Sequence, residues 1–168
     1  NNNRVLIWNK IPQTNDTPAD VVVGQPNFAS ATVSTNHVPS ASTVSGPQGV
    51  WIQSGKLYIA DTGYHRGLIF NHIPASNGAS ADVVLGQPNF TTFVQVDVTQ
   101  QQQTAAPNNM LNPVSVTSDG THLFVTDLGF NRVLIWHSIP TANGQPADVA
   151  VGQPDLVSSV PNNAFSYT

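Results

Sequence analysis

The feature that most constrains this chain is a unit that occurs three times along it. An Arg followed by a short apolar run begins at Arg4, Arg66 and Arg132, so the copies are spaced 62 and then 66 residues apart. Each run is followed by Ile-Pro, then by Ala-Asp-Val and then by Gly-Gln-Pro. An ordered set of motifs at near-constant spacing indicates a duplicated structural unit.

Each unit contains four short apolar runs separated by turn residues. In the second copy they span residues 48–53, 57–60, 66–70 and 82–86, and the next unit begins near residue 114. Runs of this length that are rich in Val, Ile and aromatic residues and bounded by Gly and Pro predict β-strands. Four strands per repeat, joined by turns, are typical of a β-propeller blade.

The composition favours strands and excludes several functions. All nine acidic residues are Asp, a poor helix former, and 13 Pro and 12 Gly punctuate the apolar runs. Five Lys plus Arg in a chain of net charge −4 provide no basic surface for nucleic acid. No apolar stretch reaches the roughly 20 residues that span a bilayer, and cysteine is absent. We therefore expect an all-β protein without a membrane span.

The order of motifs resembles the NHL repeat. A proline at Pro47 precedes Gly49-Val50, then residues 57–63 read Leu-Tyr-Ile-Ala-Asp-Thr-Gly, and Arg66 follows after two more residues. The trailing Ala-Asp-Val-Val-x-Gly-Gln-Pro segment is similar to a variety found in bacterial secreted NHL proteins. The resemblance implies a β-propeller segment of about two and a half four-stranded blades from a six-bladed ring, located outside the cell or at its surface.

We expect a single incomplete propeller domain with three parts. Residues 1–46 form the last two strands of one blade and a long loop, residues 47–112 a second blade and a long loop, and residues 113–168 a third blade and the lead-in to the next. Because both termini interrupt a unit, we expect a piece of a longer propeller. The alternative is that further copies of the chain complete a ring.

The candidate binding residues lie where the second strand of a unit turns into the third. Asp61 and Arg66 are five residues apart, as are their equivalents in the next unit, and a glycine between them is expected to supply the positive φ of a tight turn. The predicted set is Asp61, Tyr64, Arg66, Asp127, Phe130 and Arg132. The competing interpretation is structural: the Asp and Arg stabilise the turn, and the two aromatic residues pack against a neighbouring blade.

Loops are the other candidate surface. The connections over residues 29–46 and 91–112 are long, and variable loops on a rigid scaffold often bind ligands. The Gly-Gln-Pro-Asn-Phe motif at 24–28 and 86–90 is interpreted as structural, with Pro turning the chain and Phe packing between blades. Asn15 and Asn89 match the N-glycosylation pattern, which chance also explains in a chain this rich in Asn and Thr.

We find no catalytic constellation in the sequence. The five His residues do not occupy equivalent positions: His65 corresponds to Asn131 and Asn3. We therefore expect no cofactor, no metal site and a non-catalytic binding or scaffold propeller that contacts a protein or a carbohydrate. The alternative, implied by six-bladed relatives, is a metal-dependent lyase or hydrolase of the peptide-amidating-lyase or lactonase type, with its site in blades that this chain lacks.

Overall fold

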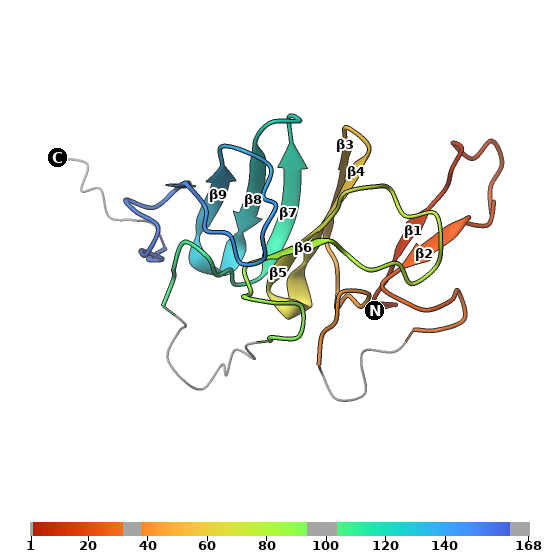
Figure 1. Ribbon diagram of the computed structural model, residues 1–168, viewed down its shortest axis with the longest axis horizontal. Coiled ribbons are helices and arrows are strands. Elements are labelled where there is room, and N and C mark those ends of the chain that lie inside the picture. Colours follow the sequence, from red (N-terminus) through yellow and green to blue (C-terminus); the bar gives the residue numbers. More distant parts are fainter. Residues whose placement is uncertain (1, 32–37, 94–103, 162–168) are drawn as a thin grey trace.

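The protein is an all-β chain whose strands form three antiparallel sheets (Figure 1). The computed structural model describes residues 2–31, 38–93 and 104–161. Within these ranges, one sheet has two strands and the other two have four strands each. The all-β prediction is thus confirmed.

The strands follow the repeat. The first sheet contains β1 (Val5–Ile7) and β2 (Val21–Val23). The second contains β3 (Gly49–Gln53), β4 (Lys56–Asp61), β5 (Arg66–Phe70) and β6 (Val83–Leu85). The third contains β7 (Pro113–Ser118), β8 (Leu123–Asp127), β9 (Arg132–Trp136) and β10 (Val149–Val151). Single turns of 3-10 helix, η1 (Thr62–Tyr64) and η2 (Leu128–Phe130), follow β4 and β8. The four strands predicted for the second unit are all present.

The register is the same in equivalent strands. Asp61 lies opposite Arg66, and Asp127 lies opposite Arg132, at the same end of the second and third sheets. Strands of the third sheet pair in the order β7-β8-β9-β10, as β3-β4-β5-β6 do in the second. Within each sheet, strands that are consecutive in the sequence are therefore hydrogen-bonded neighbours, which is the usual arrangement for strands joined by short connections.

Stacking of the sheets builds the core. Side chains of a strand alternate between its two faces, so the second sheet presents one apolar set to each neighbour. Leu57, Ile59 and Leu68 pack with residues of β1 and β2. Tyr58 and Ile69, on the opposite face, pack with residues of β8 and β9. The middle sheet is thus covered on both faces, as Figure 1 shows for its position between the other two.

Besides the turns between the first and second strands of a unit, three kinds of loop join the strands, and we name them by their place. The hairpin turns are residues 62–65 and 128–131, and the long connections are residues 29–46 and 91–112. The return loops, which join the third strand of a unit to the fourth, are residues 8–20, 71–82 and 137–148. The hairpin turns and the described parts of the long connections lie at the same end of the sheets (Figure 1), and Gly63 N–H donates to Ser45 O at 2.8 Å.

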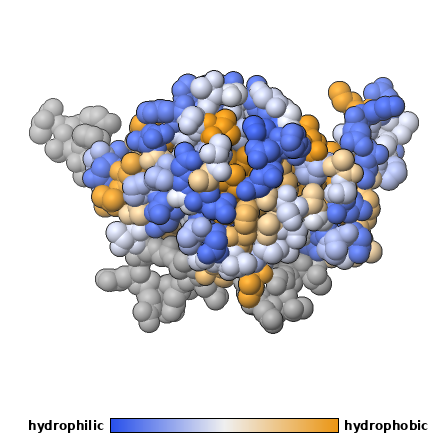
Figure 2. Space-filling model, in the orientation of Figure 1, coloured by the Kyte–Doolittle hydropathy of each residue, from blue (hydrophilic) through white to orange (hydrophobic). Residues whose placement is uncertain are grey.

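The surface in view is largely hydrophilic, with hydrophobic residues between the polar ones (Figure 2). Among the residues that the structure describes, no helix has the length and apolar character to traverse a bilayer.

Candidate functional site

The predicted Asp–Arg pairs exist and are buried at the hairpin turns. Arg66 Nε donates to Asp61 Oδ2 at 2.8 Å, and Arg132 Nε donates to Asp127 Oδ2 at 2.9 Å. All four side chains are fully buried. The other carboxylate oxygen accepts a backbone N–H from the preceding long connection, from Ser45 at 2.6 Å and from Leu111 at 2.7 Å. Each carboxylate therefore joins its turn to a loop.

The rest of each guanidinium joins the end of a long connection to the segment that follows the fourth strand of its own unit. Arg66 Nη1 donates to the carbonyl of Phe90 at 2.8 Å, where one connection starts, and Arg66 Nη2 donates to Ser40 at 3.0 Å and Thr43 at 2.7 Å in the other. Arg132 makes the same contacts in the next unit. Its acceptors are the carbonyls of Leu156 at 2.6 Å, Ala106 at 3.0 Å and Asn109 at 2.9 Å.

Burial dominates the electrostatics of these carboxylates. Loss of hydration raises the pKa of Asp61 to about 6, and the Arg66 guanidinium and the Ser45 N–H offset part of that rise. Burial also raises the pKa of Asp127 to about 6, and the N–H of Leu111 and the guanidinium of Arg132 offset part of that rise. An ionised carboxylate that is this deeply buried depends on its guanidinium partner, because removing one partner leaves a charge without compensation.

The structure corrects the expected role of the turn glycines. Positive φ occurs at the last residue of each hairpin turn, His65 (φ 53°) and Asn131 (φ 54°), and not at Gly63 or Gly129. Gly63 is required for space instead: a Cβ at this position would lie 2.5 Å from Ser45 Oγ and 2.7 Å from Ser45 O. The glycine therefore permits the close approach of the turn and the long connection.

The two predicted aromatic residues cover the guanidinium groups. Arg66 Cζ lies 5.0 Å from the ring centroid of Tyr64, and Arg132 Cζ lies 5.0 Å from that of Phe130. This geometry allows a cation–π interaction. Tyr64 also makes an edge-to-face contact with Phe93, at 5.4 Å between centroids. Among the described residues, the buried hydroxyl of Tyr64 has no hydrogen-bond partner.

All six predicted binding residues are therefore buried in this chain, and the polar groups of the Asp and Arg residues hold the turns and connections. Their exposed fractions do not exceed 3%. For the Asp and Arg residues this is the geometry of the structural interpretation, whereas the two aromatic residues contact the long connections and the guanidinium groups, where packing against a neighbouring blade was expected. The prediction that they contact a ligand stays a prediction.

Sequence reasoning missed the Gln of the Gly-Gln-Pro motif. Gln25, Gln87 and Gln153 are buried, and each Nε2 donates to a backbone carbonyl just before the repeated Arg. The acceptors are Asn3 at 3.0 Å, His65 at 3.3 Å and Asn131 at 3.0 Å. The signal was present in the sequence, because a polar residue retained in all three copies beside Gly and Pro needs a polar partner when it is buried.

The residue after Pro in the same motif closes a local turn. The side-chain oxygen Oδ1 of Asn27, Asn89 or Asp155 accepts the backbone N–H groups two and three residues further along the chain. Such turns free the following carbonyl to point inward, where it meets the Arg of its unit. The structural interpretation of the motif is thus supported by a hydrogen-bond network that extends beyond the packing of Phe28 and Phe90.

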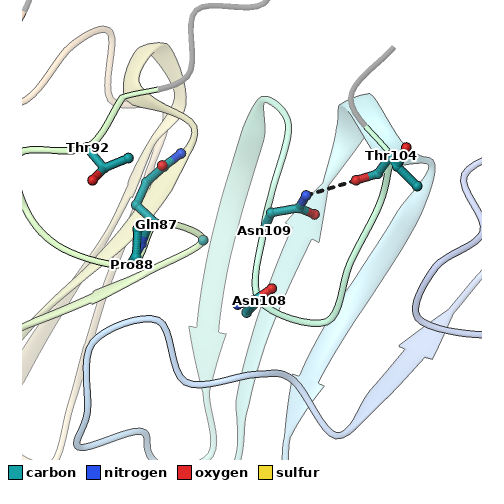
Figure 3. A pocket seen from close by; sticks show the side chains of 7 residues that line it. Gln87, Pro88, Thr92, Thr104, Asn108 and Asn109 are labelled. Carbon is teal, nitrogen blue, oxygen red and sulfur yellow. Dashed lines mark hydrogen bonds between the residues drawn. The ribbon is translucent and has the colours of Figure 1, made fainter.

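A pocket of about 450 Å³ lies beside the second long connection (Figure 3). Gln87, Pro88 and Thr92 lie on one side of it, and Thr104, Asn108 and Asn109 lie on the other (Figure 3). Asn109 Nδ2 donates to Thr104 O at 2.9 Å, which fixes the second side. No charged side chain lines this pocket, so its described walls present amides, hydroxyls and backbone groups.

The His residues serve separate local contacts. His65 lies in a hairpin turn, where its Nδ1 accepts the N–H of Asn112 at 3.0 Å and its ring stacks on Phe93 at 6.1 Å. Burial lowers the pKa of His65. Exposed His122 contacts Asp119 at 2.7 Å. Within residues 2–31, 38–93 and 104–161, no group of three or more His, Cys, Asp or Glu residues is placed to hold a metal ion.

Comparisons with protein-family models, with curated proteins and with solved structures found no match to this chain. The resemblance to NHL repeats therefore depends on the motifs themselves.

Proposed function

We propose that the chain is a segment of an NHL-type β-propeller that serves as a non-catalytic binding scaffold outside the cell or at its surface. Two successive four-stranded antiparallel sheets, stacked on each other and copied with the same register, support this assignment. The low charge and the absence of cysteine are in keeping with it.

The observation that carries the proposal is the pair of buried arginines. Each joins the end of a long connection to the segment after the fourth strand of its unit through backbone carbonyls, so the bonded ends of these loops have fixed positions at one end of the sheets. Loops held on a rigid scaffold are suited to binding, because less conformational entropy is lost when a ligand is bound. In this proposal the ion pairs build the platform, and exposed residues of the connections contact the ligand.

The pocket beside Gln87 and Asn108 is the described surface that best fits a ligand. Its neutral amide and hydroxyl groups suit a ligand with many hydroxyls and no charge, and we therefore place a carbohydrate first. A neutral polar segment of a protein is the second candidate. A volume of about 450 Å³ is within the ordinary range of small-ligand sites.

The experiment is a titration of the isotopically labelled chain with a panel of neutral oligosaccharides, followed by amide NMR shifts. We expect shifts concentrated at Thr92, Thr104 and Asn108, with saturation at increasing sugar concentration. Asn108→Ala removes an exposed amide from the wall and is expected to weaken binding at least about tenfold, or about 1.4 kcal/mol.

Thr121→Ala is the matched control, because Thr121 is exposed in a turn at the opposite end of the third sheet. It is expected to leave sugar affinity unchanged. Shifts that are absent for every sugar, or that are equally large around Thr121, would contradict the carbohydrate assignment. Shifts at the pocket with a neutral peptide alone would transfer the site to a protein ligand.

A further inference from the structure

The stacked sheets are joined by a specific contact between a return loop and the last strand of the preceding unit. Asn77 Oδ1 accepts the N–H of Val22 at 2.9 Å, and the N–H of Gly78 donates to Val22 O at 3.0 Å. Val22 lies in β2, whereas Asn77 and Gly78 belong to the return loop of the second unit. The loop therefore closes hydrogen bonds at the outer edge of its neighbour.

The next pair of units repeats this contact. Asn143 Oδ1 accepts the N–H of Val84 at 3.0 Å, and the N–H of Gly144 donates to Val84 O at 2.8 Å. Val84 is the middle residue of β6, as Val22 is of β2. Two occurrences at equivalent positions indicate a recognition contact that belongs to the repeat.

The first return loop presents the same pair of groups to solvent. Asn15 and Asp16 are both exposed and occupy the positions of Asn77-Gly78, 62 residues earlier. The backbone of Asp16 has φ 59°, close to 66° at Gly78 and 63° at Gly144. The loop thus already has the shape that the contact requires, although a non-glycine residue rarely adopts this region.

The complementary strand edge lies at the other end of the stack. β10 pairs with β9 through Ala150 opposite Leu134, in the register in which Val84 lies opposite Leu68. The backbone N–H and C=O of Ala150 therefore point away from β9, as those of Val84 point away from β5. Among the described strands, β10 is an edge of its sheet.

Apolar side chains on the two end faces show the same complementarity. Trp8 is 39% exposed, whereas its equivalents Phe70 and Trp136 are 2% and 1% exposed beneath a neighbouring sheet. The indole nitrogen Nε1 of Trp8 donates to Thr17 O at 2.9 Å, as that of Trp136 donates to Gln145 O at 3.1 Å, so the two rings are held alike.

On the opposite end face, Val149 and Val151 are 37% and 52% exposed. Their equivalents in the middle sheet, Val83 and Leu85, are buried in the cluster that contains Trp136. Between the second and third sheets, Trp136, the equivalent of Trp8, covers the equivalents of these two valines. Val149 and Val151 therefore form an apolar surface that Trp8 of another chain could cover in the same way.

We propose that the chain associates head to tail with a second copy of itself. The return loop at Asn15-Asp16 of one copy binds the β10 edge at Ala150 of the other, and Trp8 covers Val149 and Val151. The occupant is a second copy because this chain carries both halves of an interface that it already uses twice internally. Such a contact is heterologous, so it builds a ring or a filament according to whether its rotation closes.

The test is sedimentation velocity of the 168-residue chain over a range of concentrations, with one variant for each half of the interface. The unmodified chain is expected to shift to larger species as its concentration rises. Asn15→Ala combined with Trp8→Ala disables the head, and Val151→Asp disables the tail. Each variant alone is expected to stay monomeric, and their equimolar mixture is expected to form dimers that do not extend, because one intact head meets one intact tail.

Two matched controls should leave assembly unchanged. Gln13→Ala alters the same return loop, but alanine already occupies the equivalent position, Ala75, in a described interface. Val157→Asp adds the same charge at another exposed valine. Its equivalent in the second unit, Thr91, is exposed even though the second sheet is covered on both faces, so this position lies outside the contact between sheets. Far-ultraviolet circular dichroism checks that every variant retains its strands.

A monomer at every concentration overturns the proposal and leaves the β10 face to an occupant other than this chain. Oligomers that survive both disabling variants, or a mixture that stays monomeric, would also contradict the head-to-tail contact. None of these outcomes depends on ligand binding at the Asn108 pocket, so this test and the carbohydrate titration succeed or fail separately.

Discussion

The second and third sheets have the same hydrogen-bond framework but differ in what covers them. Both have an Asp–Arg pair that is fully buried and the same contacts from Arg to three carbonyls. Only the middle sheet has a neighbour on each face among the described strands. The comparison separates two contributions to stability. The Asp–Arg pairs stabilise one unit and the loops next to it, whereas the apolar faces of a sheet are buried only where a neighbouring sheet covers them.

The largest predicted effect comes from breaking an ion pair. Arg66→Met and Arg132→Met each leave a buried carboxylate without its partner and are expected to lower the free energy of unfolding by about 3–5 kcal/mol. Urea denaturation followed by circular dichroism measures the loss. The control is Arg4→Met. Arg4 donates to the Phe28 carbonyl at 2.7 Å in an exposed hydrogen bond and, among the described residues, forms no buried ion pair, so a loss below about 1 kcal/mol is expected.

Similar losses for Arg66→Met and Arg132→Met would show that the motif acts within a unit. A loss that is confined to the middle sheet would mean that the pair depends on cover from both neighbours, against our account.

A smaller effect is expected at two equivalent valines that differ in cover. Val83 is 3% exposed between sheets and Val149 is 37% exposed on the outer face. Val83→Ala is expected to cost about 1.5–3 kcal/mol, because buried methyl groups are lost and a cavity remains. Val149→Ala is expected to change stability by less than about 0.5 kcal/mol at concentrations that keep the chain monomeric. Thermal or urea unfolding compares the two, and equal losses would contradict the difference in cover.

Exchange of the two turn aromatics sharpens the comparison further. Tyr64→Phe removes a buried hydroxyl that has no partner among the described residues, so stability is expected to stay equal or to rise by up to about 1 kcal/mol. Phe130→Tyr places a hydroxyl in the equivalent apolar surroundings of Ala105 and Leu111 and is expected to destabilise. Urea midpoints measure both changes. A destabilised Tyr64→Phe variant would show that the hydroxyl has a partner after all.

The smallest effect is a pH dependence confined to one hairpin turn. The pKa of His65 is lowered by burial, so the folded chain binds this proton less readily than the unfolded chain. Its contribution to stability is present above the unfolded value near 6.5 and is lost as the pH falls through that value toward the lowered folded pKa. Protonation would also displace the Asn112 N–H that donates to Nδ1.

His65→Asn tests this dependence, because Asn131 occupies the equivalent position with the same backbone conformation. The variant is expected to lose less stability than the unmodified chain between pH 7 and pH 5. The raised pKa values of Asp61 and Asp127 act in the opposite direction, since a carboxyl with a raised folded pKa loses stability as pH rises through it, and they cancel in the difference between the two proteins. Parallel stability curves would contradict the assignment to His65.

The repeat predicted the positions of most strands, because strands and turns depend mainly on residues that are close together in the sequence. The predicted run at 66–70 coincides with β5, and the runs at 48–53, 57–60 and 82–86 differ from β3, β4 and β6 by one residue at most at any end. The spacing of five also placed Asp61 and Arg66 on the same hairpin, whereas their direct ion pair is a finding of the structure. The division into domains stays a prediction, as do the ligand, the location outside the cell and glycosylation at Asn15 and Asn89.

The remainder of the site depends on contacts between distant segments. Nothing near Gly63 in the sequence indicates that Ser45 approaches it, and the positive φ was therefore assigned to the wrong residue of the turn. The partner of Gln87 lies 22 residues away, and the partner of Asn77 lies 55 residues away. Residue type and spacing within one unit do not specify such pairings, whereas comparison of all three copies does identify which polar residues are retained.

The most direct test of the account is amide hydrogen exchange at three equivalent residues, measured at a concentration that keeps the chain monomeric. The N–H groups of Val22 and Val84 are bonded to Asn77 and Asn143 of the following unit, whereas the N–H of Ala150 lies on the side of β10 that pairs with no other described strand. We predict strong protection at Val22 and Val84 and fast exchange at Ala150. Equal protection at all three residues, or fast exchange at Val84, would contradict the claim that each repeat is completed by the return loop of the next.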